Sequence, residues 1–155
     1  MSVRPRSPEE QARHDRALQD IARAYLRYER IVLTNPDGQR NVAVGRMYPD
    51  LVIKERVPPA EARREPRVLL IGEVETPSSV NEEEVAQWRA YSRLGLPFVL
   101  FVPHASLEAA RRLLEQGQVQ VTELVGYRYV DGRIALTRLE GEGGEGRGAV
   151  GTAVA

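Results

Sequence analysis

The sequence has no cysteine and only two histidines, His14 and His104, which stand far apart along the chain. Disulfide bonds and thiolate metal sites are therefore excluded, and a histidine-rich zinc site is not expected. The chain also lacks a long apolar run, and its N-terminal residues do not resemble a signal peptide. We therefore expect a cytoplasmic protein that does not enter a membrane.

Neither sign of charge is in excess, since 22 basic and 22 acidic residues give a formal net charge of zero. Such a chain has no global attraction to nucleic acid, so any contact with phosphates must come from local patches. Lys54 is the single lysine, and arginine supplies the other basic side chains. The sequence also lacks a P-loop, a Gly-rich dinucleotide fingerprint and the constellations typical of Ser or Cys nucleophiles.

The length of 155 residues indicates a single domain that can bury a sizeable core. The composition becomes Gly-rich near residue 140, where no core can be built. We therefore predict one domain over residues 1–139 and a disordered tail over residues 140–155.

Periodicity and turn signals predict the elements in the order helix, strands, helix, strand, helix, strands. The helices are expected at residues 7–28, 82–94 and 107–116, and the strands at 30–34, 41–44, 48–53, 68–75, 97–102, 119–125, 127–130 and 133–136. The first helix is expected to bury a stripe made of Ala17, Ile21, Ala24, Tyr25 and Tyr28. This order favours an α/β fold with a mixed central sheet flanked by helices.

Three carboxylates mark the two strands at the middle of the chain. The segment 56–66 holds three prolines and reads as a loop, so the strands at 48–53 and 68–75 should form an antiparallel hairpin. Asp50 then opens one strand where Glu73 and Glu75 close the other, and period-two alternation puts both glutamates on one face.

Carboxylates that meet at a strand end repel one another, and a hard divalent cation is the simplest compensation. Oxygen ligands favour Mg²⁺, Mn²⁺ or Ca²⁺. The alternative is that Glu73 and Glu75 lie on a solvated strand end while Asp50 belongs to a turn.

Four segments appear in an order that resembles a known family: Pro49-Asp50, Glu73-Val74-Glu75, Gln87 followed by Tyr91, and an apolar strand at 97–102. Together they resemble the PD-(D/E)XK nuclease superfamily, in its RecB-like branch with a Q-x-x-x-Y helix. The resemblance covers roughly residues 20–102. It implies a restriction-endonuclease-like core and metal-dependent cleavage of phosphodiester bonds in nucleic acid, DNA before RNA.

The resemblance also implies roles for individual residues. Asp50 and Glu73, joined by the carbonyl of Val74, would hold Mg²⁺ or Mn²⁺. Gln87 and Tyr91 would brace the site or contact the nucleic acid. The superfamily often adds an acid from the first helix, for which Asp20 is the first candidate and Asp15 the alternative.

One position departs from the family motif, because Glu75 stands where the motif has a lysine. In the family that lysine helps to orient and activate the attacking water. Glu75 would be a further metal ligand or would orient the water itself, which keeps the chain an enzyme. The alternatives are a catalytically silent member that binds nucleic acid or protein, and an interaction module with structural carboxylates. The sequence also leaves open whether the chain forms a homodimer.

Overall fold

The computed structural model of the chain describes residues 5–139 and the short strand at 152–154. The helices are α1 (Pro8–Ala24), α2 (Glu82–Ser92) and α3 (Leu107–Gln116), and 3₁₀ turns lie at Pro59–Glu61 and His104–Ser106. The strands are β1 (Arg30–Thr34), β2 (Leu51–Glu55), β3 (Val68–Val74), β4 (Phe98–Pro103), β5 (Glu123–Val130), β6 (Arg133–Leu139) and β7 (Thr152–Val154). Among the described residues, no helix has the length and apolarity that crossing a membrane requires.

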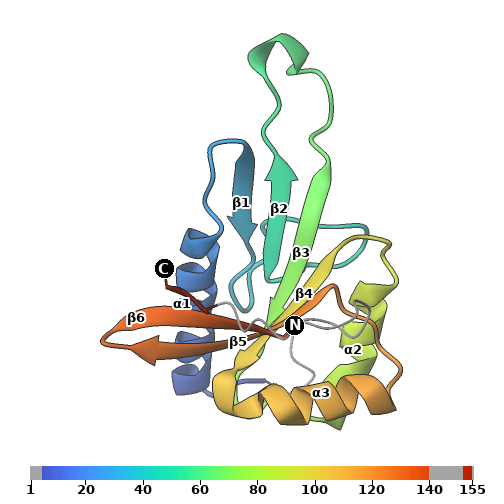
Figure 1. Ribbon diagram of the computed structural model, residues 1–155. Helices are drawn as coiled ribbons and strands as arrows, with labels where there is room; N and C mark the ends of the chain where they lie inside the picture. The colour runs from blue at the N-terminus through green and yellow to red at the C-terminus, as the bar shows by residue number, and fades with distance from the viewer. Residues whose placement is uncertain (1–4, 140–151, 155) are drawn as a thin grey trace, which may run out of the picture.

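The strands form one mixed sheet in the order of the sequence, from β1 to β7. Pairing is antiparallel from β1 to β3, parallel from β3 to β5, and antiparallel again from β5 to β7. Helix α1 covers one face of the sheet, while α2 and α3 lie on the other side (Figure 1). The predicted α/β class, with a mixed sheet flanked by helices, is therefore confirmed.

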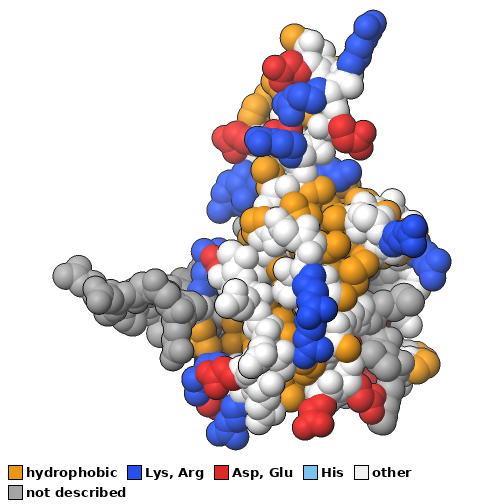
Figure 2. All heavy atoms as spheres, turned by 90° about the vertical axis from the view of Figure 1, so that its right-hand side faces the viewer, with side chains coloured by type: hydrophobic (Ala, Val, Ile, Leu, Met, Phe, Trp, Pro, Cys, Tyr) orange, Lys and Arg blue, Asp and Glu red, His pale blue; other side chains and the backbone are white. Residues whose placement is uncertain are grey.

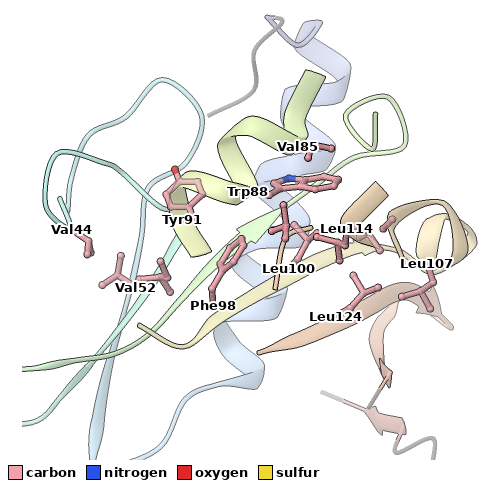
Figure 3. Packing of buried hydrophobic residues seen from close by; sticks show 14 residues of the cluster. Val44, Val52, Val85, Trp88, Tyr91, Phe98, Leu100, Leu107, Leu114 and Leu124 are labelled. Carbon is pink, nitrogen blue, oxygen red and sulfur yellow. The ribbon is translucent and has the colours of Figure 1, made fainter. Parts of the chain in front are cut away.

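Two hydrophobic layers hold the helices against the sheet. Alternate residues of the central strand β4 serve the two layers, since Phe98, Leu100 and Val102 pack under α2 and α3. Val99 and Phe101 point the other way and pack under α1. Figure 3 shows the first of these layers, in which the helix side chains lie over β4. The period of two along β4 thus explains how one strand supports helices on both faces.

Helix α1 begins as the sequence predicts, with the Ser7 hydroxyl accepting a hydrogen bond from the Glu10 N–H at 3.2 Å and Pro8 in the first turn. It ends at Ala24 rather than near Tyr28, and Tyr28 is 85% exposed. Tyr28 was therefore wrongly placed in the buried stripe. The stripe instead begins one turn earlier, at His14.

Three predicted strands differ from the structure. Residues 41–44 make no strand, because the chain reverses at Gly45 (φ +61°) and Val44 pairs only with Met47. The predicted pair 119–125 and 127–130 is the single strand β5, which starts at Glu123. Gly126 does not interrupt it; a Cβ atom there would lie 2.6 Å from Leu107 Cδ1, so glycine serves close packing rather than a turn.

The hairpin predictions hold. Strands β2 and β3 pair antiparallel, as expected, and Asp131-Gly132 forms the tight turn between β5 and β6 with φ values of 51° and 76°. The segment between β2 and β3 is largely loop, as predicted, and projects from the body (Figure 1). The predicted disordered tail at 140–155 falls outside the described residues, apart from β7, which pairs with β6.

Charged side chains of both signs are mixed on the face shown in Figure 2, including the projecting segment between β2 and β3. No broad region of a single sign covers that face. Any binding of a charged partner there must therefore depend on a few side chains rather than on an extended field.

Replacing Leu100 by alanine tests the importance of the central strand. Leu100 is completely buried, so Leu100→Ala should lower the free energy of unfolding by about 2–5 kcal/mol through lost transfer energy and a cavity. Leu69 on β3 is 39% exposed and offers a matched control, whose alanine variant should lose less than about 1 kcal/mol. Urea denaturation measures both values, and equal losses would contradict the packing described.

Candidate functional site: a buried carboxylate cluster

Asp50 lies just before β2 and is almost completely buried. Its Oδ2 atom accepts a hydrogen bond from the Val74 N–H at 2.8 Å and lies 3.1 Å from Nε2 of His14. The Asp50 N–H donates in turn to Oε1 of Glu73 at 2.9 Å. The antiparallel hairpin thus brings Asp50 and Glu73 together at one end of the sheet.

Glu75 follows the last residue of β3 and is also buried. Its Oε1 accepts a hydrogen bond from the indole N–H of Trp88 at 2.9 Å. Its Oε2 has no hydrogen-bond partner, and the guanidinium of Arg6 lies 3.9 Å away. The backbone also fixes this residue, since the Glu75 N–H donates to Phe101 O at 2.8 Å.

The three acids are therefore not solvated. Asp50 is 3% exposed, and Glu73 and Glu75 are each 2% exposed, which rules out the alternative of acids on a solvated strand end. Burying a charge is costly unless it is paired, so something must compensate this cluster.

His14 is a partner that the sequence reasoning missed. It is completely buried on α1, with Nδ1 lying 2.9 Å from Asp15 Oδ1 and 3.7 Å from Asp37 Oδ1. A signal was available, because His14 stands three, four and seven residues before the buried Ala17, Leu18 and Ile21. That spacing puts it on the sheet-facing side of the helix.

Arg6 is the second residue that was missed. Its guanidinium forms an ion pair with Asp37 and approaches Glu75, and its side chain is 5% exposed. Because Arg6 directly precedes the helix cap Ser7, the start of α1 carries it to the cluster. The sequence held no signal for this contact, which depends on how the chain enters the helix.

Burial and neighbouring charges set the protonation of the cluster. Burial, with the charge of Asp50 adding to it, raises the pKa of Glu73 to about 8, and burial raises that of Glu75 to about 7. Burial acts against the charged form of His14, but the hydrogen bond and charge of Asp50 outweigh it and raise the His14 pKa to about 9. Burial likewise opposes the charged form of Asp50, but His14 lowers its pKa overall. Near neutral pH the cluster thus holds an Asp50–His14 ion pair beside a protonated Glu73.

Helix α2 places Tyr91 and Gln87 beside this cluster. Tyr91 is buried, and its hydroxyl donates to Tyr48 O at 3.4 Å; the Gln87 amide lies 3.5 Å from the same hydroxyl. Burial, together with the charges of Glu73 and Asp50, raises the pKa of Tyr91, which keeps the phenol neutral. Trp88 and Tyr91 project from the same side of α2 over β4 (Figure 3). The bracing role expected for Gln87 and Tyr91 is consistent with this placement and stays a prediction.

Asp20 is not brought to the cluster. Its carboxylate accepts a hydrogen bond from the Tyr129 hydroxyl at 2.8 Å and pairs with Arg16 and Arg23 on the exposed side of α1. Asp15, the alternative acid on this helix, contacts His14. The helical repeat explains the difference, since five residues rotate a side chain by about 140° around the axis.

The side chains whose possible metal-ligand atoms lie closest together are not the three acids that the sequence predicted. Over the described residues, one group of three acid or histidine side chains has ligand atoms within 4.8 Å of one another, namely His14, Asp15 and Asp37. Asp50, Glu73 and Glu75 share one end of the sheet without forming a further group of this kind.

No protein-family model matches the sequence, and no match was found among curated proteins or solved structures. The chemistry of the carboxylate cluster must therefore carry the functional argument.

The pH dependence of stability reports on the buried glutamate. The folded-state pKa of Glu73 is raised from 4.5 to about 8, so its contribution to stability is full below pH 4.5 and is lost as the pH rises through 8. His14, raised from 6.5 to about 9, acts in the same direction. We therefore expect the melting temperature in metal-free buffer to fall as the pH rises from 5 to about 9.

A glutamine at position 73 keeps an acceptor for the Asp50 N–H but cannot ionise. Glu73→Gln should therefore match the wild type near pH 5 and exceed its stability near pH 8.5 by at least about 1 kcal/mol. Glu115→Gln, a control on the exposed face of α3, should keep the wild-type profile. Thermal melts between pH 5 and pH 8.5 measure the stability of both variants. If the stability of Glu73→Gln falls with pH as steeply as that of the wild type, the pKa of Glu73 is not raised.

Proposed function

We propose that this chain is a divalent-metal-dependent nuclease with a restriction-endonuclease-like core, which hydrolyses phosphodiester bonds in nucleic acid, DNA before RNA. The observation that carries the proposal is the burial of three carboxylates at one end of the sheet, one of which has a buried oxygen without a hydrogen bond. Such a cluster gains most from a ligand that is itself positive.

The order of elements supports the same proposal. Asp50 precedes β2, Glu73-Val74-Glu75 ends β3, and α2 then presents Gln87 and Tyr91 before the buried strand β4. This is the order of motifs in which the sequence resembles the PD-(D/E)XK nucleases.

The donor atoms fit Mg²⁺ or Mn²⁺, which prefer hard oxygen ligands. The backbone N–H of Asp50 donates to the Glu73 carboxylate, and the Val74 N–H donates to the Asp50 carboxylate. The N–H and C=O of one strand residue face the same edge, so the Val74 carbonyl faces the Asp50 side as well. Asp50, Glu73 and this carbonyl would hold the ion, which would polarise the scissile phosphate and lower the pKa of a bound water.

The other residues would keep the site in order. His14 and the Val74 N–H fix the Asp50 carboxylate in place. Glu75, in the position of the motif lysine, would orient the attacking water through Oε2, because Trp88 already holds Oε1. Tyr91 and Gln87 would brace the segment that leads to Asp50, since the Tyr91 hydroxyl donates to Tyr48 O.

The second candidate is a catalytically silent protein of the same fold that binds nucleic acid or another protein. Two observations favour it. The cluster is already compensated by the Asp50–His14 pair and by protonation of Glu73, and Glu75 replaces the motif lysine.

Metal binding separates a working site from structural carboxylates. Millimolar Mg²⁺ or Mn²⁺ should raise the melting temperature, since a ligand at 100 times its Kd stabilises a protein by about 2.7 kcal/mol. Asp50→Asn should remove this gain. Asp131→Asn, in the exposed β5–β6 turn, should keep it. A metal-induced shift that survives Asp50→Asn would place the ion elsewhere.

Cleavage separates the nuclease from its silent alternative. With Mn²⁺, the wild type should cleave supercoiled plasmid or single-stranded DNA, and Glu73→Gln should not, because the ion loses a ligand. Gel electrophoresis over time measures the rates. Metal binding without cleavage of any DNA or RNA form would favour the silent candidate. If the protein neither binds metal nor cleaves nucleic acid, the interaction module with structural carboxylates is favoured.

A further inference from the structure

A cavity of about 280 Å³ lies directly beside the carboxylate cluster. The loop at 35–40 and Tyr48 line it, and Asp50 forms part of its wall. This volume is near the lower end of the roughly 300–1,000 Å³ of small-molecule sites. We call it the Tyr48 pocket. A group seated in it would touch the same aspartate that the proposed metal site uses.

Asn35 holds the loop of this pocket in place, although the loop belongs to no strand. Its side-chain amide donates to Val42 O and Pro49 O, each at 2.7 Å. Its side-chain oxygen accepts from the N–H groups of Asn41 and Val42 at 2.8 and 2.7 Å. The Asn35 N–H donates to Asp50 O at 2.9 Å, so the pocket and the acid are fixed relative to each other. Because the Asn35 side chain is buried and all its polar atoms are hydrogen-bonded, it holds the loop that lines the pocket in a fixed conformation.

Tyr48 supplies the aromatic side chain of the pocket. Tyr48 is half-buried, and the guanidinium carbon of Arg40 lies over its ring, 5.4 Å from the centre. Arg40 itself is exposed, so its side chain can move aside and let a planar group take its place on the ring without unfolding the loop. Aromatic and arginine side chains are the usual platforms for unpaired bases.

The charged residues that line the Tyr48 pocket determine which part of a nucleotide can bind in it. Asp37 and Asp50 both line the pocket, against the single cation Arg40, and Arg6 is already paired with Asp37. Two carboxylates disfavour a phosphate group there. They do not disfavour a neutral base, whose amino groups can donate to Asp37 while Gln39 offers both a donor and an acceptor.

We propose that the Tyr48 pocket binds one unstacked base of a single-stranded nucleic acid and thereby sets a neighbouring phosphate beside Asp50 and Glu73. Cleavage at that phosphate rests on the proposed nuclease function, whereas base binding does not. The substrate class is then single-stranded nucleic acid, or a strand with an unpaired nucleotide, because a base within a duplex must first be unstacked and unpaired.

Binding without cleavage tests the pocket. A dye-labelled single strand of about 12 nucleotides is titrated in EDTA at low salt, with the same sequence as RNA and as a DNA duplex for comparison. Fluorescence anisotropy should show tighter binding of the single strands than of the duplex. Tyr48→Ala should weaken single-strand binding by about 5- to 100-fold, the usual effect of losing one stacked base. Tyr48→Phe should retain it, because the ring remains.

A matched control lies elsewhere on the surface. Tyr28 carries Arg56 at 5.9 Å from its ring and is highly exposed, yet it does not line the pocket. Tyr28→Ala should leave binding within about twofold of the wild type. Equal losses for Tyr28→Ala and Tyr48→Ala, equal weakening of single strand and duplex, or no single-strand binding by the wild type would overturn the proposal.

The outcome is independent of the metal site, because single-strand binding is measured in EDTA, where no divalent ion is bound. Failure of the metal and cleavage tests would leave base binding standing, and the converse also holds. Should Tyr48→Ala not fold, photo-crosslinking of the wild type to an oligonucleotide with 4-thiothymidine decides. The adduct should lie on the tryptic fragments 31–40 or 47–54, which hold the residues that line the pocket, and adducts only elsewhere would refute the pocket.

Discussion

One carboxylate oxygen joins three parts of this fold. Asp50 Oδ2 meets the Val74 N–H at the end of β3 and the His14 imidazole on α1, while Asp50 itself leads into β2. Removing one partner of such a buried pair typically costs about 3–5 kcal/mol, because the other charge is left uncompensated. The register of the β2–β3 hairpin and the docking of α1 are therefore coupled at one atom. Two further acids, Glu73 and Glu75, flank the donor Val74 in the sequence and are buried with it.

The charge of this cluster is balanced from within, and that balance has a consequence for any cation. Glu73 is protonated near neutral pH because burial and Asp50 disfavour its ionised form. At the proposed metal site, an ion and this proton would compete for the same carboxylate, so metal affinity should increase as the pH rises toward 8. His14 plays a different part, because its positive charge stabilises the ionised Asp50 in the metal-free cluster. Under this proposal, the protonated cluster and a metal-loaded cluster would be two charge states of one arrangement.

The sequence predicted the parts that local patterns determine. Strand β1 and helix α3 have the predicted bounds, and the predicted antiparallel hairpin correctly brought Glu73 and Glu75 to the end of the sheet where Asp50 lies. The predictions that were wrong failed because contacts between residues distant in sequence decided the outcome. Gly126 was taken for a break because its close packing against Leu107 is invisible in the sequence. Asp20 was preferred to Asp15 because it directly precedes the apolar Ile21 and Ala22, but the helical repeat turns its side chain away from the cluster.

The segment that the sequence misassigned most clearly is the one beside the pocket. Residues 41–44 were expected to form a strand, yet the chain from Asn35 to Asp50 makes a loop whose backbone is held largely by one buried asparagine. A protein gains little stability from replacing a regular ladder with such side-chain bonds, and irregular segments held rigidly beside buried acids are typical of binding sites. The zero net charge of the chain points the same way. A chain of zero net charge has no global attraction to phosphates, whereas stacking on an aromatic ring requires no excess of positive charge.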